Sequence, residues 1–392
     1  MSTADDRRRR VLFLVPTLRR AGAETQVVDL VNGLDTSRFE KHLAFFEPRA
    51  DLLDRVDRAN VHVHRLARRH KLDLSLMRQI TQLLERHEIE VVHCTLQISL
   101  FFAFLGRLGA KLHPKLIAAI HTTVNQSWRQ ELYDRLLYRR LLRRCDRVQF
   151  VCHSQAELWI GKYPELKPLA AVVYNGVDTA SYDPADSIAS GAELRRRLGL
   201  APGAFVISSI AGFRPEKGHA FLLEAFAKLP AEASLLLAGD GPERPRIEAL
   251  AAHLGVQERV ILLGEVADVR PVISASDVTV LASTAVETFS MAMLESMALA
   301  VPVIATRVGG LSEAITPGET GDLVPPGDAV ALHQSLQRML DDEEGRRSMG
   351  QRARARVSRQ FSQRAMAEAT AELLSDILVG GVPVSRAGAL HD

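Results

Sequence analysis

Short runs of apolar residues alternate along the chain with longer segments in which apolar residues recur at every third or fourth position. The runs are typical of strands buried on both faces of a parallel sheet, and the longer segments, such as 74–84 and 128–142, of amphipathic helices. Strands are predicted in the first half at residues 11–15, 42–46, 61–66, 91–94, 116–120, 148–151 and 171–174, and in the second half at residues 205–210, 234–238, 260–263, 278–281 and 303–305. Two such series predict two doubly wound α/β domains.

Turn-forming residues separate the two series. Residues 175–178 read Asn-Gly-Val-Asp, and an Asp-Pro pair and small residues follow. We expect an N-terminal domain over residues 1–175, a linker over 176–190 and a C-terminal domain over 191–361. A last helix is predicted from about residue 362 to 378. With 392 residues, the chain is long enough for two domains of ordinary size.

Charge is unevenly distributed between the halves. Residues 1–175 hold 29 basic and 19 acidic residues, and residues 176–392 hold 20 and 28, so the halves carry +10 and −8. This asymmetry indicates that the first half meets an anionic partner, and we expect peripheral contact with an anionic membrane rather than with nucleic acid.

Several protein classes are excluded by composition and pattern. The apolar run after the arginines at 7–10 ends at Pro16, too short for a signal peptide, and no stretch approaches the ~20 apolar residues of a membrane span. Cys94, Cys145 and Cys152 lack metal-ligand spacing, so we interpret them as buried thiols in a reducing cytoplasm. The 47% hydrophobic and 24% charged residues are typical of a globular protein.

The first candidate site follows the predicted strand at 278–281. Glu287 and Glu295 enclose the start of a predicted helix. The N–H groups of Ser290, Met291 and Ala292 and the positive end of the helix dipole would favour a diphosphate. The two carboxylates suit sugar and ribose hydroxyls, which donate hydrogen bonds. On this segment alone, a surface helix with two solvated glutamates is the simpler interpretation.

The second candidate site is the turn after the predicted strand at 205–210. Gly212 and Gly218 permit tight turning, and Arg214 and Lys217 place two cations at the carboxyl end of the same sheet. Cations in that place stabilise a leaving diphosphate. A basic surface turn is the alternative, and it is weakened because two motifs from different strands converge.

Two further candidate positions follow predicted strands in the first half. Gly22 lies in a small-residue loop that lets backbone approach a ligand, and His121 ends the predicted strand at 116–120. A lone histidine is more often structural than catalytic, and only its position favours function. The loop at Gly22 and residues 239–242 both lack the dinucleotide-binding glycine pattern, which disfavours a nicotinamide oxidoreductase.

Residues 129–144 form a predicted basic amphipathic helix. Leucines gather on one side, with arginines elsewhere at positions 135, 139, 140, 143 and 144. Such a helix can lie on anionic lipid, but packing on the sheet with arginines in water is the favoured interpretation.

These motifs in this order resemble the retaining glycosyltransferases of family 4, which have the GT-B fold. The resemblance covers nearly the whole chain and rests on Glu287 and Glu295 with seven residues between them, joined by Gly22, His121 and Lys217. Residues 175–178, 239–242, 303–310 and 321–328 also resemble family segments. The resemblance implies two Rossmann-like domains facing a cleft, with a C-terminal helix over 362–380 crossing back to the N-terminal domain.

The resemblance also implies a donor site in the C-terminal domain. Lys217 and a nearby arginine are expected to hold the diphosphate, Glu295 the ribose, and Glu287 to lie beside the sugar. The base is expected to meet backbone near residues 263–266, including Gly264 and Val266. Gly212 stands where the family commonly has an arginine, so Arg214 is expected to take that role.

The N-terminal domain is implied to bind the acceptor, a glycan, lipid-linked or small molecule. His121 is expected to contact the donor sugar, and Gly22 to approach the phosphate. Here the first loop reads Ala-Gly where the family often has Gly-Gly, and Thr288 and Ser290 replace typical glycines. The implied activity is hexosyl transfer from a UDP or GDP type sugar, in cell-envelope or polysaccharide synthesis in the cytoplasm.

The expected mechanism is a metal-independent front-face displacement. No nucleophilic carboxylate is evident in the N-terminal motifs, and the chain contains no Asp-x-Asp sequence. Lys217, Arg214 and the helix dipole would take the place of a metal, so no cofactor is expected. A sugar-nucleotide epimerase of the same fold and a non-catalytic nucleotide-sugar-binding module remain alternatives.

Overall fold

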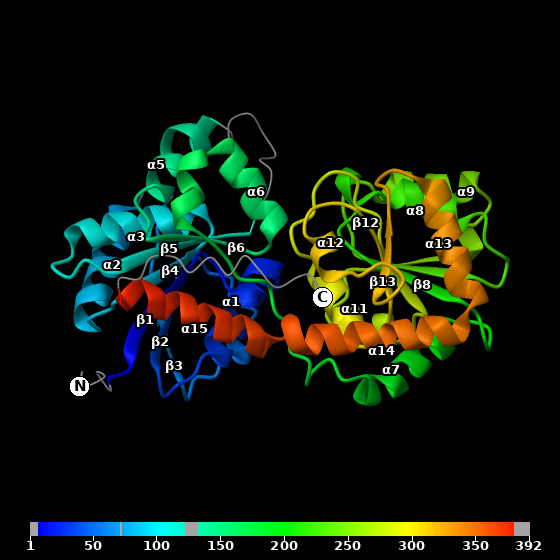
Figure 1. Ribbon diagram of the computed structural model, residues 1–392, viewed down its shortest axis with the longest axis horizontal. Coiled ribbons are helices and arrows are strands. Elements are labelled where there is room, and N and C mark those ends of the chain that lie inside the picture. The colour runs from blue at the N-terminus through cyan, green and yellow to red at the C-terminus, as the bar shows by residue number, and fades with distance from the viewer. Residues whose placement is uncertain (1–6, 71–72, 122–131, 380–392) are drawn as a thin grey trace. The chain divides into compact units, whose positions relative to one another are not determined.

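The computed structural model describes residues 7–70, 73–121 and 132–379, which form two compact units (Figure 1). One unit comprises the chain up to Gly176 together with the segment from Gln363 onward, and the other comprises Val177–Ser362. Each unit holds one parallel sheet covered by helices on both faces.

The first unit has a seven-stranded sheet in the order β3-β2-β1-β4-β5-β6-β7. Its strands are β1 (Arg9–Val15), β2 (Phe39–Phe45), β3 (Val61–Arg65), β4 (Val91–Thr95), β5 (Lys115–Ile120), β6 (Arg147–Phe150) and β7 (Ala170–Val172). Its described helices are α1 (Gly22–Gly33), α2 (Leu74–Arg86), α3 (Gln97–Gly109), a π-helical turn (Asp134–Tyr138), α5 (Arg139–Leu142), α6 (His153–Lys162) and α15 (Gln363–Val379), with short 3₁₀ turns at Leu53–Arg55 and Pro164–Leu169.

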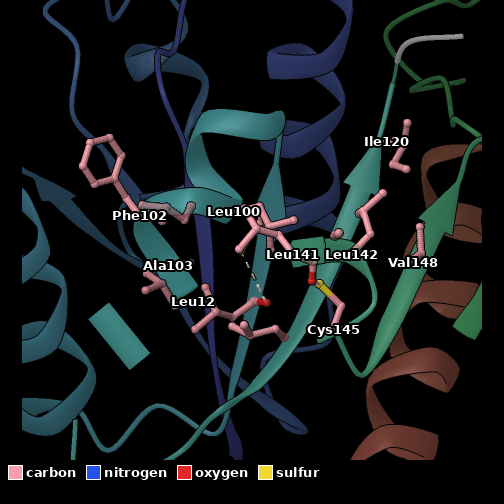
Figure 2. Packing of buried hydrophobic residues seen from close by; sticks show 14 of the residues in the cluster. Leu12, Leu100, Phe102, Ala103, Ile120, Leu141, Leu142, Cys145 and Val148 are labelled. Carbon is pink, nitrogen blue, oxygen red and sulfur yellow. Dashed lines mark hydrogen bonds between the residues drawn. The ribbon is translucent and has the colours of Figure 1, made fainter. Parts of the chain in front are cut away.

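Two apolar clusters cover the faces of this sheet. One packs α2, α3, α5 and α6 on one face, and Figure 2 shows part of it, including Leu12, Phe102 and Leu142. The other packs α1 and α15 on the opposite face. Cys94, Cys145 and Cys152 are buried and are not joined by disulfide bonds. Burial on both faces explains why these strands read as continuous apolar runs.

The second unit has a six-stranded sheet in the order β10-β9-β8-β11-β12-β13. Its strands are β8 (Val206–Ile210), β9 (Ser234–Ala238), β10 (Val260–Gly264), β11 (Val278–Leu281), β12 (Val303–Thr306) and β13 (Gly321–Val324). Its helices are α7 (Pro184–Arg197), α8 (His219–Phe226), α9 (Arg244–His253), α10 (Arg270–Ser274), α11 (Met291–Ala298), α12 (Leu311–Ala314), α13 (Ala329–Asp341) and α14 (Glu343–Gln360), with 3₁₀ turns at Pro215–Lys217 and Gln257–Arg259.

The chain passes between the units at two neighbouring points. The Val177 N–H donates to the Phe361 carbonyl oxygen (2.9 Å), beside a bridge to Ser362. In the first unit, the Gln26 side chain bonds both backbone groups of Gly176. The helix α15 then packs on α1, so the expected return of the C-terminal helix is confirmed (Figure 1).

Two details differ from the sequence expectations. The segment 176–190, expected as a linker, is helical from Pro184, because Asp183 caps α7 by accepting from the Ala185 N–H. Strand β13 was not predicted, because Gly321 and Asp322 interrupt its apolar run. No helix within the described ranges is long and apolar enough to cross a bilayer.

Candidate active site

The candidate donor site lies where the strand order of the second sheet reverses. Strands β8 and β11 are neighbours, with Ile207 opposite Val278, although β9 and β10 lie between them along the chain. Their connections leave in opposite directions, which is where doubly wound sheets open a crevice for ligands. The turn after β8 and the loop after β11 therefore meet at one edge.

Backbone contacts hold these two segments together. The Thr284 N–H donates to the Glu216 carbonyl oxygen (2.9 Å). Gly218 has φ +67°, and a Cβ there would lie 2.0 Å from the Ala282 carbonyl oxygen. Only glycine fits this position, both for its left-handed backbone and for the close approach. The segment carrying Lys217 is thus fixed against the segment leading to Glu287.

Lys217 and Glu287 form a direct ion pair in this site. The Lys217 Nζ lies 2.6 Å from Glu287 Oε2, and the side chains are only 15% and 10% exposed. The Ser283 hydroxyl donates to the same carboxylate oxygen (3.0 Å). Two mostly desolvated charges of opposite sign compensate each other, and an arriving anion would compete with Glu287 for the lysine.

The loop after β12 supports the backbone of Glu287. Gly309, after β12, has φ +55°, and a Cβ there would lie 1.8 Å from the Glu287 carbonyl oxygen. The Gly310 N–H donates to the Thr288 carbonyl oxygen (2.8 Å). The segment 303–310, noted in the sequence, therefore shapes the site through its backbone.

Helix α11 begins next to this carboxylate, as predicted. Ser290 is the extended residue before the helix, and the first intrahelical bond of the ladder runs from the Leu294 N–H to the Ser290 carbonyl oxygen (3.3 Å). The N–H groups of Met291 and Ala292 belong to the first turn, whose geometry leaves them without partners in the helix. They are aligned for an anion at the positive end of the dipole.

Glu295 lies one turn further along α11. Its Oε1 accepts a hydrogen bond from the hydroxyl of Tyr182 (2.9 Å). Burial and the nearby Glu295 charge raise the pKa of Tyr182, so the phenol stays a donor. The sequence reasoning missed Tyr182 because it lies more than a hundred positions away in the segment before α7, without a local signal.

Arg214 extends over the glycine-containing turn. Its Nε lies 3.1 Å from Glu216 Oε1, and its side chain is about half exposed. The same Nε lies 3.8 Å from the place of a Cβ at Gly212. The guanidinium of Arg214 therefore lies in van der Waals contact with the place that a Cβ at position 212 would take.

The glycines at 239–242 serve packing. The Phe213 N–H donates to the Asp240 carbonyl oxygen (2.8 Å), and a Cβ at Gly239 or Gly241 would lie 2.1 Å or 2.5 Å from a carbonyl of the turn after β8. At the end of β10, Gly264 has φ +69° and its carbonyl accepts from the Gly239 N–H (2.8 Å). Val266 packs partly buried beside this end of the sheet.

The remaining candidates belong to the first unit. Gly22 opens α1, and nothing lies within 4 Å of a Cβ built there. In the same first turn the buried Glu24 accepts from the Thr17 hydroxyl (2.9 Å) and the Arg19 Nε (3.2 Å), which the sequence reasoning did not anticipate. His121 directly follows β5, and burial, with the nearby His93, lowers its pKa to about 4. Its imidazole is thus neutral at pH 7.

Comparison with known proteins agrees with this architecture. Residues 20–181 match the family model described as Glycosyltransferase Family 4, and residues 191–356 match the model for Glycosyl transferases group 1. HepE of Anabaena in complex with UDP superimposes with a TM-score of 0.81 at 24% identity, over 94% of this chain and 100% of that one. Two parallel-sheet units with a returning helix define the GT-B glycosyltransferase fold.

Curated relatives place the chain within this class. N-acetyl-alpha-D-glucosaminyl L-malate synthase of Bacillus anthracis is 32% identical over 295 residues, covering 74% of this chain and 75% of that protein. The lipopolysaccharide core biosynthesis glycosyltransferase LpsE of Rhizobium meliloti is 35% identical over 46% of this chain and 53% of its own. The chain belongs to glycosyltransferase family 4, and it is a glycosyltransferase.

Proposed function

We propose that this enzyme transfers a hexose from a UDP or GDP type sugar to an acceptor hydroxyl, with retention of configuration and without a metal. The Lys217–Glu287 pair at the start of α11 carries the proposal, because it sets a cation and a hydroxyl-accepting carboxylate beside aligned N–H groups. The UDP bound by HepE, which has the same fold, supports a uridine nucleotide.

Each polar group has a role in this proposal. Lys217, Arg214 and the N–H groups of Met291 and Ala292 receive the diphosphate, Glu295 the ribose hydroxyls, and Glu287 the sugar hydroxyls. The backbone at Gly264 and Val266 receives the base. The N-terminal unit binds the acceptor, which is a glycan, a lipid-linked sugar or a small molecule. His121 contacts the sugar, and Gly22 approaches the phosphate.

The reaction needs no protein nucleophile. The bond between the anomeric carbon and the diphosphate oxygen breaks, and the acceptor oxygen bonds to that carbon on the same face. The acceptor proton passes to the departing diphosphate oxygen. The diphosphate gains negative charge as it leaves, and Lys217 and the α11 dipole stabilise that charge in place of a metal ion.

Calorimetric titration with UDP, GDP and ADP in EDTA tests the donor site. We expect one nucleotide to bind with a Kd on the order of micromolar, about −8 kcal/mol, because four preformed groups receive the diphosphate. Transfer from the matching sugar nucleotide should continue in EDTA. Absence of binding for all three would remove the donor assignment, and binding that requires added Mg²⁺ would remove the metal-independent mechanism.

We also propose that the basic N-terminal unit contacts anionic membrane. Helical residues 132–142 bury Tyr138, Leu141 and Leu142, while Leu132 and Leu136 stay 48% and 52% exposed. Arg140 and Arg143 are exposed on the same segment, whereas Arg139 pairs with Glu165. An exposed apolar pair flanked by arginines is typical of an interfacial helix.

Vesicle co-sedimentation with phosphatidylglycerol measures this contact. Replacing Arg140 and Arg143 with Glu should weaken vesicle binding roughly tenfold or more, because each cation near an anionic surface contributes about 1 kcal/mol. Leu132→Ser with Leu136→Ser should also reduce pelleting. Ile188→Ser, a similarly exposed site on α7, is the control. Equal pelleting of all variants would argue against membrane contact.

A further inference from the structure

Four histidines gather at the edge of the first sheet, whereas the loops that carry the candidate donor site belong to the other unit. His42 lies on β2, His62 and His64 lie on β3, and His87 directly follows α2. In the parallel register His42 stands opposite His62, and His64 is two residues further along β3. Since residues two apart on a strand share a face, the three strand histidines project to the same side. Helix α2 packs on that side and brings His87 to them.

Three of these rings have nitrogen atoms that lie close to one another. One ring nitrogen from each of His42, His64 and His87 lies within 4.8 Å of the others. The His42 Nδ1 is 3.0 Å from the His64 Nε2. A tetrahedral zinc ion with Zn–N bonds of about 2.0 Å holds its nitrogens roughly 3.3 Å apart. Side-chain adjustments on the order of an ångström therefore bring the three nitrogens to coordination distance.

Glu40 orients the most buried of these rings. Its Oε1 lies 3.3 Å from the His42 Nε2, on the side opposite Nδ1. A carboxylate only accepts, so this contact places the ring proton on Nε2 and leaves a lone pair on Nδ1. Metal-binding histidines in proteins commonly donate their second N–H to a carboxylate in this manner.

The rings are largely closed to solvent. His42 is buried, and His64 and His87 are half-buried. Two cations lie near them. Arg10 is itself paired with Glu88, and Arg86 is the other cation near His87.

We propose that His42, His64 and His87 bind one Zn²⁺ ion, with Glu40 orienting His42 and the 62% exposed His62 bordering the site. Three imidazoles with an open fourth position suit zinc. The ion joins the edge strand β3 and its neighbour β2 to the end of α2 within the first unit. No metal ligands were predicted from the sequence, so this site departs from that expectation, and it is proposed in addition to the metal-independent transfer.

Zinc titration of the full chain tests the proposal. The protein is stripped with EDTA, exchanged into metal-free buffer and titrated with Zn²⁺ against a chromophoric chelator. We expect one ion per chain and a rise in Tm on binding. His64→Gln and His87→Gln should each weaken the tightest site at least tenfold, and Glu40→Ala should weaken it roughly tenfold. His253→Gln, an exposed histidine on α9, should bind as the parent does.

Cobalt spectroscopy on the unaltered chain covers variants that fold poorly. One equivalent of Co²⁺ should give the visible absorption of a tetrahedral histidine-ligated ion, and Zn²⁺ should displace it. The proposal is overturned if the parent binds no stoichiometric ion. It is also overturned if the spectrum stays that of hydrated Co²⁺, or if folded His64→Gln and His87→Gln bind zinc as the parent does.

Discussion

Replacing Lys217 with alanine is expected to lower kcat/KM for sugar transfer by roughly 10²–10³-fold, the loss typical of removing one preorganised group that stabilises developing negative charge. The loss has a second source in this structure. Glu287 is only 10% exposed and would be left without its cation. An uncompensated carboxylate beside the start of α11 would repel the diphosphate, so nucleotide affinity should fall together with turnover.

The double variant Lys217→Ala/Glu287→Gln separates these two sources. If repulsion contributes, the double variant should bind the bare nucleoside diphosphate more tightly than Lys217→Ala alone, a coupling that a double-mutant cycle measures. Lys228→Ala, an exposed lysine of the same unit, is the matched control. Calorimetry and initial rates supply both readouts. Unchanged nucleotide affinity in Lys217→Ala would mean that the ion pair only holds two loops together.

The same variants distinguish the alternative activities. A binding module would lose affinity but has no turnover to lose. An epimerase would convert the donor without a second substrate, whereas a transferase joins the sugar to an acceptor and releases the nucleoside diphosphate. Analysis of products from the parent enzyme therefore accompanies the Lys217 measurements.

The fold was largely predictable because both sheets are parallel and buried on both faces. Such strands appear as uninterrupted apolar runs, and twelve predicted runs correspond to strands β1–β12. Strand β2 begins earlier than predicted and includes Lys41. This lysine is buried, and its Nζ donates to the Leu34 carbonyl oxygen (2.9 Å). Lysine counts as polar in the sequence pattern, so the pattern does not predict a core position for it. Its hydrogen bond to a backbone carbonyl compensates for its burial in the fold.

The candidate site was predictable only where its residues lie in segments that directly follow strands. The turn with Lys217 and the helix after Glu287 directly follow neighbouring strands, so their convergence follows from topology. Tyr182, Ser283 and the support from Gly309 depend on long-range packing that no local pattern encodes. The histidine cluster had one local signal, the His-x-His spacing of β3, but its partners on β2 and after α2 lie about twenty positions to either side.

Replacing Glu287 with glutamine is expected to reduce kcat for sugar transfer by roughly 10²-fold while the affinity for the bare nucleoside diphosphate stays equal or rises. Glutamine has nearly the shape of glutamate and still accepts from the Ser283 hydroxyl. It no longer competes with the diphosphate for the Lys217 ammonium, so the affinity for the nucleotide is not expected to fall. The proposed hydrogen bonds from the sugar hydroxyls lose their charged acceptor, and this loss falls on the reacting sugar.

Glu295→Gln provides the matched comparison on the same helix. The glutamine at this position keeps the Tyr182 contact but lacks the charge that is proposed to receive the ribose hydroxyls. The affinities for the bare nucleotide and for the sugar nucleotide should therefore fall together. The two glutamates are therefore assigned to different parts of the donor by opposite effects on the bare nucleotide. Equal weakening of bare nucleotide by both substitutions would contradict this division, because Glu287 would then contact the nucleotide rather than the sugar.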